Sequence, residues 1–164
     1  MDRRVVSFLI GGAVLLALYP TAKLATAQPQ PPSLMFVQSA QKIDYKNGVM
    51  TLYGVPEQTV FFTDRPNRVM GNLPTTAFTA KWTTDTGPNG FAKNPPNAAV
   101  SVFEPGGVKT AIVELTNPRL DGNNLSYDVK VLQGIPGAQA AAGVVFIDSF
   151  GLPSWASNAF APPG

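Results

Sequence analysis

Residues 124–132, NLSYDVKVL, alternate apolar and polar side chains with a period of two. Their apolar members share one face of an extended chain, and Ser126 and Asp128 share the opposite face. This alternation is typical of a strand with one buried face and one face in water. Residues 110–116, TAIVELT, show the same pattern. The segment between them, NPRLDGNN, carries the Pro, Asp-Gly and Asn residues that favour a turn, so we predict a β-hairpin.

Five further segments have strand patterns. Residues 34–45 and 49–55 flank Asn47-Gly48, and Asn-Gly is the strongest short signal for a two-residue hairpin turn. The other three segments are 58–63 (QTVFFT), 98–104 (AAVSVFE) and 142–148 (AGVVFID). About seven short strands, with most Pro and Gly residues between them, predict an all-β fold. The architecture is then an antiparallel β-sandwich or a flattened barrel.

One short helix near residues 75–83 interrupts the strands. Thr75 or Thr76 is suited to cap its N-terminus, and Phe78 and Trp82, four residues apart, fall on one helical face. Two interpretations of this face stay open. Either the helix lays both aromatic side chains over an open end or edge of the sheet, or Trp82 stacks on a ligand.

The first 27 residues resemble a cleaved secretory signal peptide. A basic start at Arg3-Arg4 precedes an apolar run at 5–19, and Ala25-Thr26-Ala27 matches the small-x-small cleavage pattern. The run is shorter than the roughly 20 apolar residues that span a bilayer. We therefore predict export by the Sec route to the periplasm or the medium. An uncleaved anchor and the twin-arginine route are the alternatives.

The mature chain is predicted to hold a single sandwich-like domain, residues 28–150, followed by an irregular, Pro-rich tail at 151–164. The signal takes three of the 12 basic and one of the 10 acidic residues with it, which leaves nine of each. A neutral chain has no general attraction for nucleic acid or anionic lipid. We predict no nucleic-acid partner and no membrane span after signal cleavage.

The chain contains no His and no Cys. It therefore lacks the residues for a Ser-His-Asp or Cys-His site and the usual ligands of zinc and copper. It also has neither a G-x-S-x-G elbow nor a phosphate loop. We predict no enzyme activity, no cofactor and no metal. The remaining carboxylates leave one catalytic alternative, a glycan hydrolase or lyase that uses two carboxylates and Trp82 as a sugar-stacking surface.

The densest polar cluster is the segment 64–68, DRPNR, which follows an apolar strand. Asp64 is able to accept backbone N–H groups in an Asx-turn, and Arg65 and Arg68 offer planar donors for carboxylates. The segment is either a structural corner, in which an arginine pairs with Asp64 or another carboxylate, or a recognition site for an anionic group with Trp82 as an apolar wall. The candidate binding residues are Asp64, Arg65, Arg68, Trp82 and Arg119.

Four motif blocks follow one another along the chain. They are F-[ST]-D-R-P-x-R-x-x-G at 62–71, T-x-x-F-x-x-x-W at 75–82, P-P-N-A at 95–98 and N-P-R-L…L-x-Y-x-V at 117–129. In this order the blocks resemble a family of small exported bacterial proteins of unknown function. The resemblance covers about residues 36–148. It implies export and a shared fold, and it implies no catalytic residues.

These observations predict an exported, non-catalytic β-domain with a binding or structural role at the cell envelope or outside the cell. Its partner would be a protein or a glycan. A subunit of a surface assembly is a further alternative, because a charged content of only 13% leaves room for an exposed apolar patch that marks a partner face.

Overall fold

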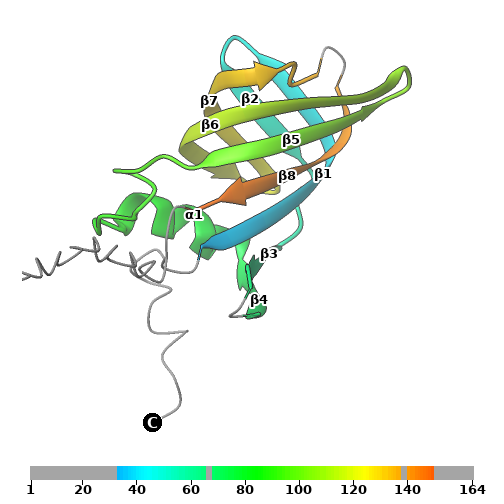
Figure 1. The fold of residues 1–164 in the computed structure, drawn as a ribbon. Helices are drawn as coiled ribbons and strands as arrows, with labels where there is room; N and C mark the ends of the chain where they lie inside the picture. Colours follow the sequence, from blue (N-terminus) through cyan, green and yellow to red (C-terminus); the bar gives the residue numbers. More distant parts are fainter. Residues whose placement is uncertain (1–32, 66–67, 138–139, 150–164) are drawn as a thin grey trace, which may run out of the picture.

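The computed structural model describes residues 33–65, 68–137 and 140–149. The predicted signal peptide and the predicted tail lie outside these residues. Figure 1 shows the elements in chain order. They are β1 (Leu34–Lys46), β2 (Val49–Tyr53), β3 (Gln58–Thr63), β4 (Met70–Pro74), α1 (Thr75–Thr84), β5 (Asn97–Glu104), β6 (Gly107–Asp121), β7 (Asn124–Gly134) and β8 (Ala141–Asp148).

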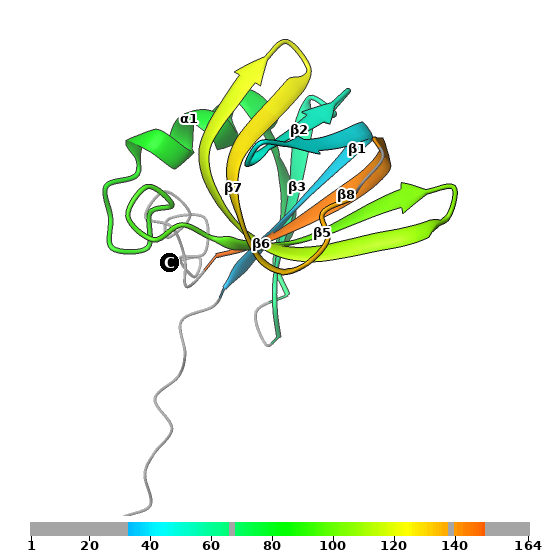
Figure 2. The same ribbon diagram turned by 90° about the horizontal axis from the view of Figure 1, so that it is seen from above.

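Six of the described strands close into an antiparallel barrel, in the order β1-β2-β7-β6-β5-β8 and back to β1. The ring of strands is visible in Figure 2. The other two strands form an outer hairpin: β3 pairs with the first residues of β1, and β4 pairs with β3. The all-β prediction is confirmed, and of its two alternatives the closed barrel is the observed architecture.

Alternate residues of the barrel strands point inward and form the core. In β7, Leu125 and Tyr127 are fully buried, whereas Val131 is 37% exposed and lies beyond Asp128, where the pairing of β7 with β2 ends. The turn at Asn47-Gly48 has positive φ at both residues, 53° and 78°, as predicted for a two-residue hairpin. The other fully buried large side chains include Phe36, Leu34, Ile43, Met50, Leu52, Leu115, Ile147, Val100 and Val102.

Helix α1 covers one end of the barrel with an aromatic cluster. The Phe78 ring lies 5.1 Å from Phe36 of β1, and the Trp82 ring lies 5.5 Å from Tyr127 of β7. Phe91, in the loop after the helix, packs edge-on against Trp82 at 4.6 Å. The predicted role of the helix in covering an open end of the sheet is confirmed. No helix of the described residues has the length and apolar character needed to cross a membrane.

The predicted helix cap is wrong. Pro74 occupies the N-cap position, and no side chain caps the helix. Thr75 is instead the first helical residue, and its hydroxyl points into the interior, where it donates a hydrogen bond of 2.8 Å to the carbonyl of Pro56. Proline suits this start because its fixed φ fits the chain entering a helix.

The strand predictions also need two corrections. Strand β4 has the sequence MGNLP, which contains weak strand formers, and pairing with β3 imposes its conformation. The predicted turn NPRLDGNN is mostly strand, because β6 continues to Asp121 and only Gly122-Asn123 turns. A β-bulge interrupts the pairing of β6 with β7: the register shifts between Thr116 and Arg119, and Asn117 has φ of 48°.

The start of β1 and the residue that follows β8 are joined to each other by hydrogen bonds. The backbone N–H of Leu34 donates to Oγ of Ser149 at 3.0 Å, and that hydroxyl donates back to the Leu34 carbonyl at 2.9 Å. The N–H of Ser149 donates to the same carbonyl at 2.9 Å. The buried Ser149 side chain therefore fastens the end of β8 to the start of β1.

Candidate functional site

The polar segment around Asp64 forms the exposed tip of the β3–β4 hairpin. It connects β3 to β4, and the helix begins only after β4. Oδ1 of Asp64 accepts a hydrogen bond of 2.6 Å from the backbone N–H of Arg65. The expected ion pair between an arginine of this segment and Asp64 or another carboxylate is not formed within residues 33–65, 68–137 and 140–149. The ion pair found there joins Arg119 and Asp128. Arg65 and Arg68 are both exposed, and Arg68 has φ of 49°. The tip of the hairpin therefore exposes two arginine side chains, and no ion pair among the described residues holds them in place.

Trp82 does not lie beside Arg65 and Arg68. Its side chain is 3% exposed, and its neighbours are Phe78, Phe91 and Tyr127. Both ribbon views place α1 away from the β3–β4 tip (Figures 1 and 2). The aromatic face is occupied by core residues, so the expected apolar wall beside an anion is not formed.

Arg119 belongs to a polar cluster on the β6 bulge. One guanidinium nitrogen donates to Oδ1 of Asp128 at 2.7 Å, and the other donates to the Asn117 carbonyl at 3.0 Å. The Asn117 amide donates to Oδ2 of Asp128 at 2.8 Å. The hydrogen bonds from Arg119 and Asn117 lower the pKa of Asp128. Because the bulge itself uses the charge of Arg119, this residue offers less to an incoming anion than Arg65 or Arg68.

A buried chain of hydrogen bonds crosses the interior from β7 to α1. The Tyr127 phenol donates to Oε1 of Gln38 at 2.7 Å, and the Gln38 amide donates to the Thr59 hydroxyl at 3.4 Å. Thr59 and Thr75 share a hydrogen bond of 3.0 Å. Since Thr75 donates onward to the Pro56 carbonyl, the Thr59 hydroxyl is the donor of that bond. Sequence reasoning missed this chain, although Gln38 stands at an inward position of β1.

Burial raises the pKa of Tyr127, against the opposing effect of its hydrogen bond to Gln38. The phenol therefore keeps its proton at neutral pH and acts as a hydrogen-bond donor. Each member of the chain has a partner, so it is a structural network that joins three strands and the helix.

Four cavities among the described residues are each lined by at most one carboxylate. The cavity beside the helix N-terminus has a volume of about 380 Å³ and is lined by one carboxylate, that of Glu57. The cavity of about 440 Å³ near Pro95-Pro96 is lined by Asp148, whose pKa is raised by burial. Two smaller hollows along α1 have no acidic lining residue. A glycosidase needs two carboxylates that face each other across one cleft.

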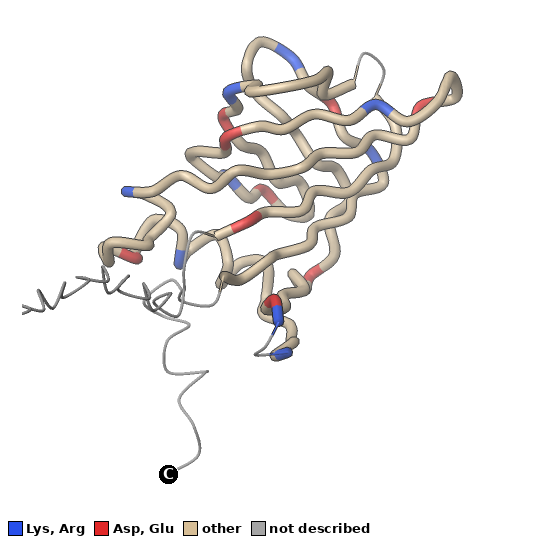
Figure 3. The backbone as a smooth tube through the Cα atoms, in the orientation of Figure 1, with Lys and Arg blue, Asp and Glu red and all other residues tan. Residues whose placement is uncertain are grey.

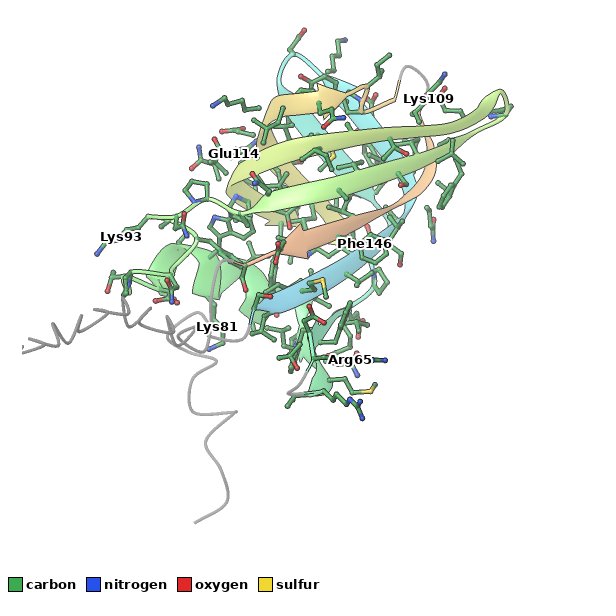
Figure 4. The ribbon with its side chains drawn as sticks, viewed as in Figure 1. Arg65, Lys81, Lys93, Lys109, Glu114 and Phe146 are labelled. Atoms are coloured by element: carbon green, nitrogen blue, oxygen red, sulfur yellow. The ribbon has the colours of Figure 1, made fainter. Side chains whose placement is uncertain are left out.

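A second surface was not predicted in detail. We call it the outer sheet face: the outward side of β4, β3, β1, β8 and β5. Cross-strand pairing places Val60, Val37, Phe146 and Ala99 side by side in one lateral row. Val60 is 41% exposed and Phe146 is 43% exposed. Figure 4 labels Phe146 on β8.

A neighbouring row runs parallel to the first on the same face. It contains Met70, Phe62, Met35 and Asp148, again in direct cross-strand register. Met70 is 78% exposed, the largest value among the exposed large hydrophobic side chains of the described residues. The stretches 34–41, 97–103 and 141–147, which form most of β1, β5 and β8, carry no charged residue, whereas β6 and β7 on the other side carry several (Figure 3). The outer sheet face is therefore an apolar surface with few charges.

The signal for this face was present in the sequence. Val144, Val145 and Phe146 are consecutive, so an inward-facing core residue has apolar neighbours that must point outward. The same holds for Val60-Phe61-Phe62, where Phe61 contacts the core residue Phe36 and its two neighbours face out. A strand that is apolar on both sides needs a second surface to cover it.

Comparisons with protein-family models, with curated proteins and with solved structures find no match to this chain. The resemblance drawn from the four motif blocks stays a prediction. The function must be argued from the chain itself.

Proposed function

We propose that this protein is an exported, non-catalytic domain that acts by binding a protein partner through its outer sheet face. The observation that carries this proposal is the continuous apolar row from Val60 through Val37 to Phe146. Contiguous exposed apolar patches on soluble proteins mark interaction sites. The core of a protein interface is depleted in charge and rich in aromatic residues and Met, which matches Phe62, Met70 and Phe146.

The glycan hydrolase alternative has little to support it. The chain lacks His and Cys, and each described cavity is lined by at most one carboxylate. The buried Trp82 leaves no open aromatic face for a sugar ring. The surface-assembly alternative is favoured by the same apolar face, and it differs from the main proposal only in the number of subunits that associate.

Export is the second part of the proposal. It is supported by the basic start, the apolar run at 5–19 and the Ala25-Thr26-Ala27 pattern. The mature protein purified from producing cells is expected to begin at Gln28 by N-terminal sequencing. A full-length chain that fractionates with membranes would indicate an anchor instead.

The binding role is tested by site-specific photo-crosslinking in the producing cell. A benzophenone amino acid replaces Phe146 on the outer sheet face, and in a matched control it replaces Lys130 on β7, across the barrel. Both positions are exposed. Crosslinked products from position 146 and not from position 130 support the proposal. Equal products, or none at either position, contradict it.

A further inference from the structure

We propose that the partner of the outer sheet face is a second copy of this chain, packed face to face about a two-fold axis that lies parallel to the strands, between β1 and β3. This inference rests on the proposed function and adds the identity of the partner. It is argued from the symmetry of the face and from the charges at its two ends.

The row of Met70, Phe62, Met35 and Asp148 spans four adjacent strands. Neighbouring strands are about 4.8 Å apart, so Met70 and Asp148 lie at nearly equal distances on either side of the line between β3 and β1. A two-fold axis along this line exchanges β4 with β8 and β3 with β1. Each copy then meets the other in the same register.

The exchange brings apolar residues together at the centre. Phe62 of one copy faces Met35 of the other, a contact between an aromatic ring and a thioether that is favourable. In the next row Val60 faces Val37 in the same way. The most exposed side chain of the face, Met70, comes over β8 of the second copy. Two sheets packed in an aligned manner about 10 Å apart bury side chains in this arrangement.

The charges at the two ends of the face are opposite. At the β4 end, Arg65 and Arg68 are exposed, and neither has an ion-pair partner among the described residues. Asp64 is the one carboxylate beside them, so this end carries a net positive charge. At the β8 end stands Asp148, which also has no ion-pair partner in the described part of the chain.

The same two-fold exchange brings these ends together. Arg68 precedes Met70 by two residues, and Met70 of one copy overlies Asp148 of the other. A guanidinium on its long side chain is suited to reach that carboxylate. Each dimer contains this contact twice, because the surface that meets itself about a two-fold axis is the same on both copies. Glu114, further along the row, is the cross-strand neighbour of Lys130 and lies outside the contact.

The two ion pairs fix how the apolar rows meet. Apolar faces alone slide over one another, whereas opposite charges at the ends select one register and oppose others. The proposed contact is therefore apolar in the middle and directed by charge at its rim.

Sedimentation velocity on the exported chain tests the inference over a concentration series. The wild-type chain is expected to form a dimer that weakens in high salt, since the ion pairs lie at the rim. Arg68→Asp and Asp148→Arg each place like charges at both contacts, and each is expected to raise the dimer dissociation constant by about tenfold or more. Asp tolerates the positive φ at position 68. Thermal melting confirms that each variant is folded.

The double variant Arg68→Asp, Asp148→Arg restores both contacts with the charges exchanged. Recovery of the dimer supports the inference, and failure to recover overturns it. A wild-type chain that stays monomeric at all concentrations also overturns it.

The crosslinking at position 146 separates this outcome from failure of the proposed function. A product with the mass of two copies supports both proposals. A product with a different protein keeps the binding function and overturns the dimer. A purely monomeric chain without intermolecular products overturns both, as would occur if another segment of the same chain covered the face.

Discussion

The phenol of Tyr127 on β7 donates a hydrogen bond of 2.7 Å to Gln38 on β1, 89 positions earlier in the chain. The two residues stand on strands that do not pair with each other, so the bond crosses the barrel interior. A buried amide whose oxygen and nitrogen both have partners fixes how strands and helix sit relative to one another.

Tyr127→Phe leaves the Gln38 amide oxygen buried without its donor. We expect a loss of about 1–3 kcal/mol in the free energy of unfolding, the usual cost of an unsatisfied buried polar group. Urea denaturation measures it. Tyr45→Phe is the matched control, because Tyr45 packs against the core and donates no described side-chain hydrogen bond. Equal stabilities of the two variants would contradict a role for the buried chain.

Gly143→Ala tests how tightly the barrel wall is packed. A Cβ at this position would meet the Ser101 carbonyl oxygen at 2.5 Å and the Ile43 side chain at 2.7 Å. We expect a destabilisation of about 1–3 kcal/mol, typical of overpacking. Gly106→Ala is the control, since a Cβ there has nothing within 4 Å. Thermal melting that shows the same loss at both positions would rule out a packing cause.

Asp128→Asn removes the carboxylate that Arg119 and Asn117 hold. The folded-state pKa of Asp128 is lowered from 3.8, so its contribution to stability is present above that pH and is lost as the pH falls through the folded-state pKa. The pair is exposed, so the loss at neutral pH is expected to be below about 1 kcal/mol. The difference in unfolding free energy between wild type and variant should shrink as the pH is lowered from 7 to values well below 3.8. A difference in unfolding free energy that stays constant with pH would contradict a link between the ionisation of Asp128 and folding.

Asp148→Asn is expected to change the stability in the opposite direction, towards a more stable fold at neutral pH. Burial raises the pKa of Asp148 from 3.8, so the charged form disfavours folding at neutral pH, and this cost disappears as the pH falls through the raised pKa. We expect the variant to melt slightly higher than wild type at pH 7, and the gain to vanish in acid. The measurement is made at a dilution where the chain is monomeric. A lower melting temperature at pH 7 would show that Asp148 has a stabilising partner.

Asp64→Ala is expected to change stability by less than about 0.5 kcal/mol, because its carboxylate is exposed and accepts one local hydrogen bond. The sequence had suggested an ion-paired corner, for which the same change is costly. Chemical denaturation of the variant distinguishes the two cases. A large loss would mean that Asp64 has a structural contact that the exposed tip does not explain.

Local patterns were sufficient for most strands. The alternation in 124–132 and the Asn47-Gly48 turn depend on neighbouring residues alone, so the sequence predicts both. Strand β4 was missed because Gly71, Asn72 and Pro74 are weak strand formers, and a distant strand imposes the extended conformation. Closure of the barrel likewise depends on pairing between segments far apart in the chain.

The candidate site was harder to predict, because the partner of a charged side chain is decided in three dimensions. Arg119 pairs with Asp128 across a bulge, while Arg65, directly beside Asp64, has no ion pair with any residue that the structure describes. The spacing of Trp82 from Phe78 placed both on one helical face but left core cover and ligand stacking open, and its contact with Phe78 in the core decides for the first. The outer sheet face has a local signal, because consecutive apolar residues in β3 and β8 place apolar side chains on both sides of each strand.

The fastening of Leu34 to Ser149 has a mechanical consequence. The described chain enters and leaves the barrel at one point, where three hydrogen bonds join two antiparallel strands. A force applied between these two ends would pull β1 and β8 apart one hydrogen bond at a time, beginning at Ser149, rather than load the whole ladder together. The barrel is therefore expected to unfold at low force when it is pulled by both ends of the described chain. A higher unfolding force is expected when it is pulled by one of these ends and by a position on another strand.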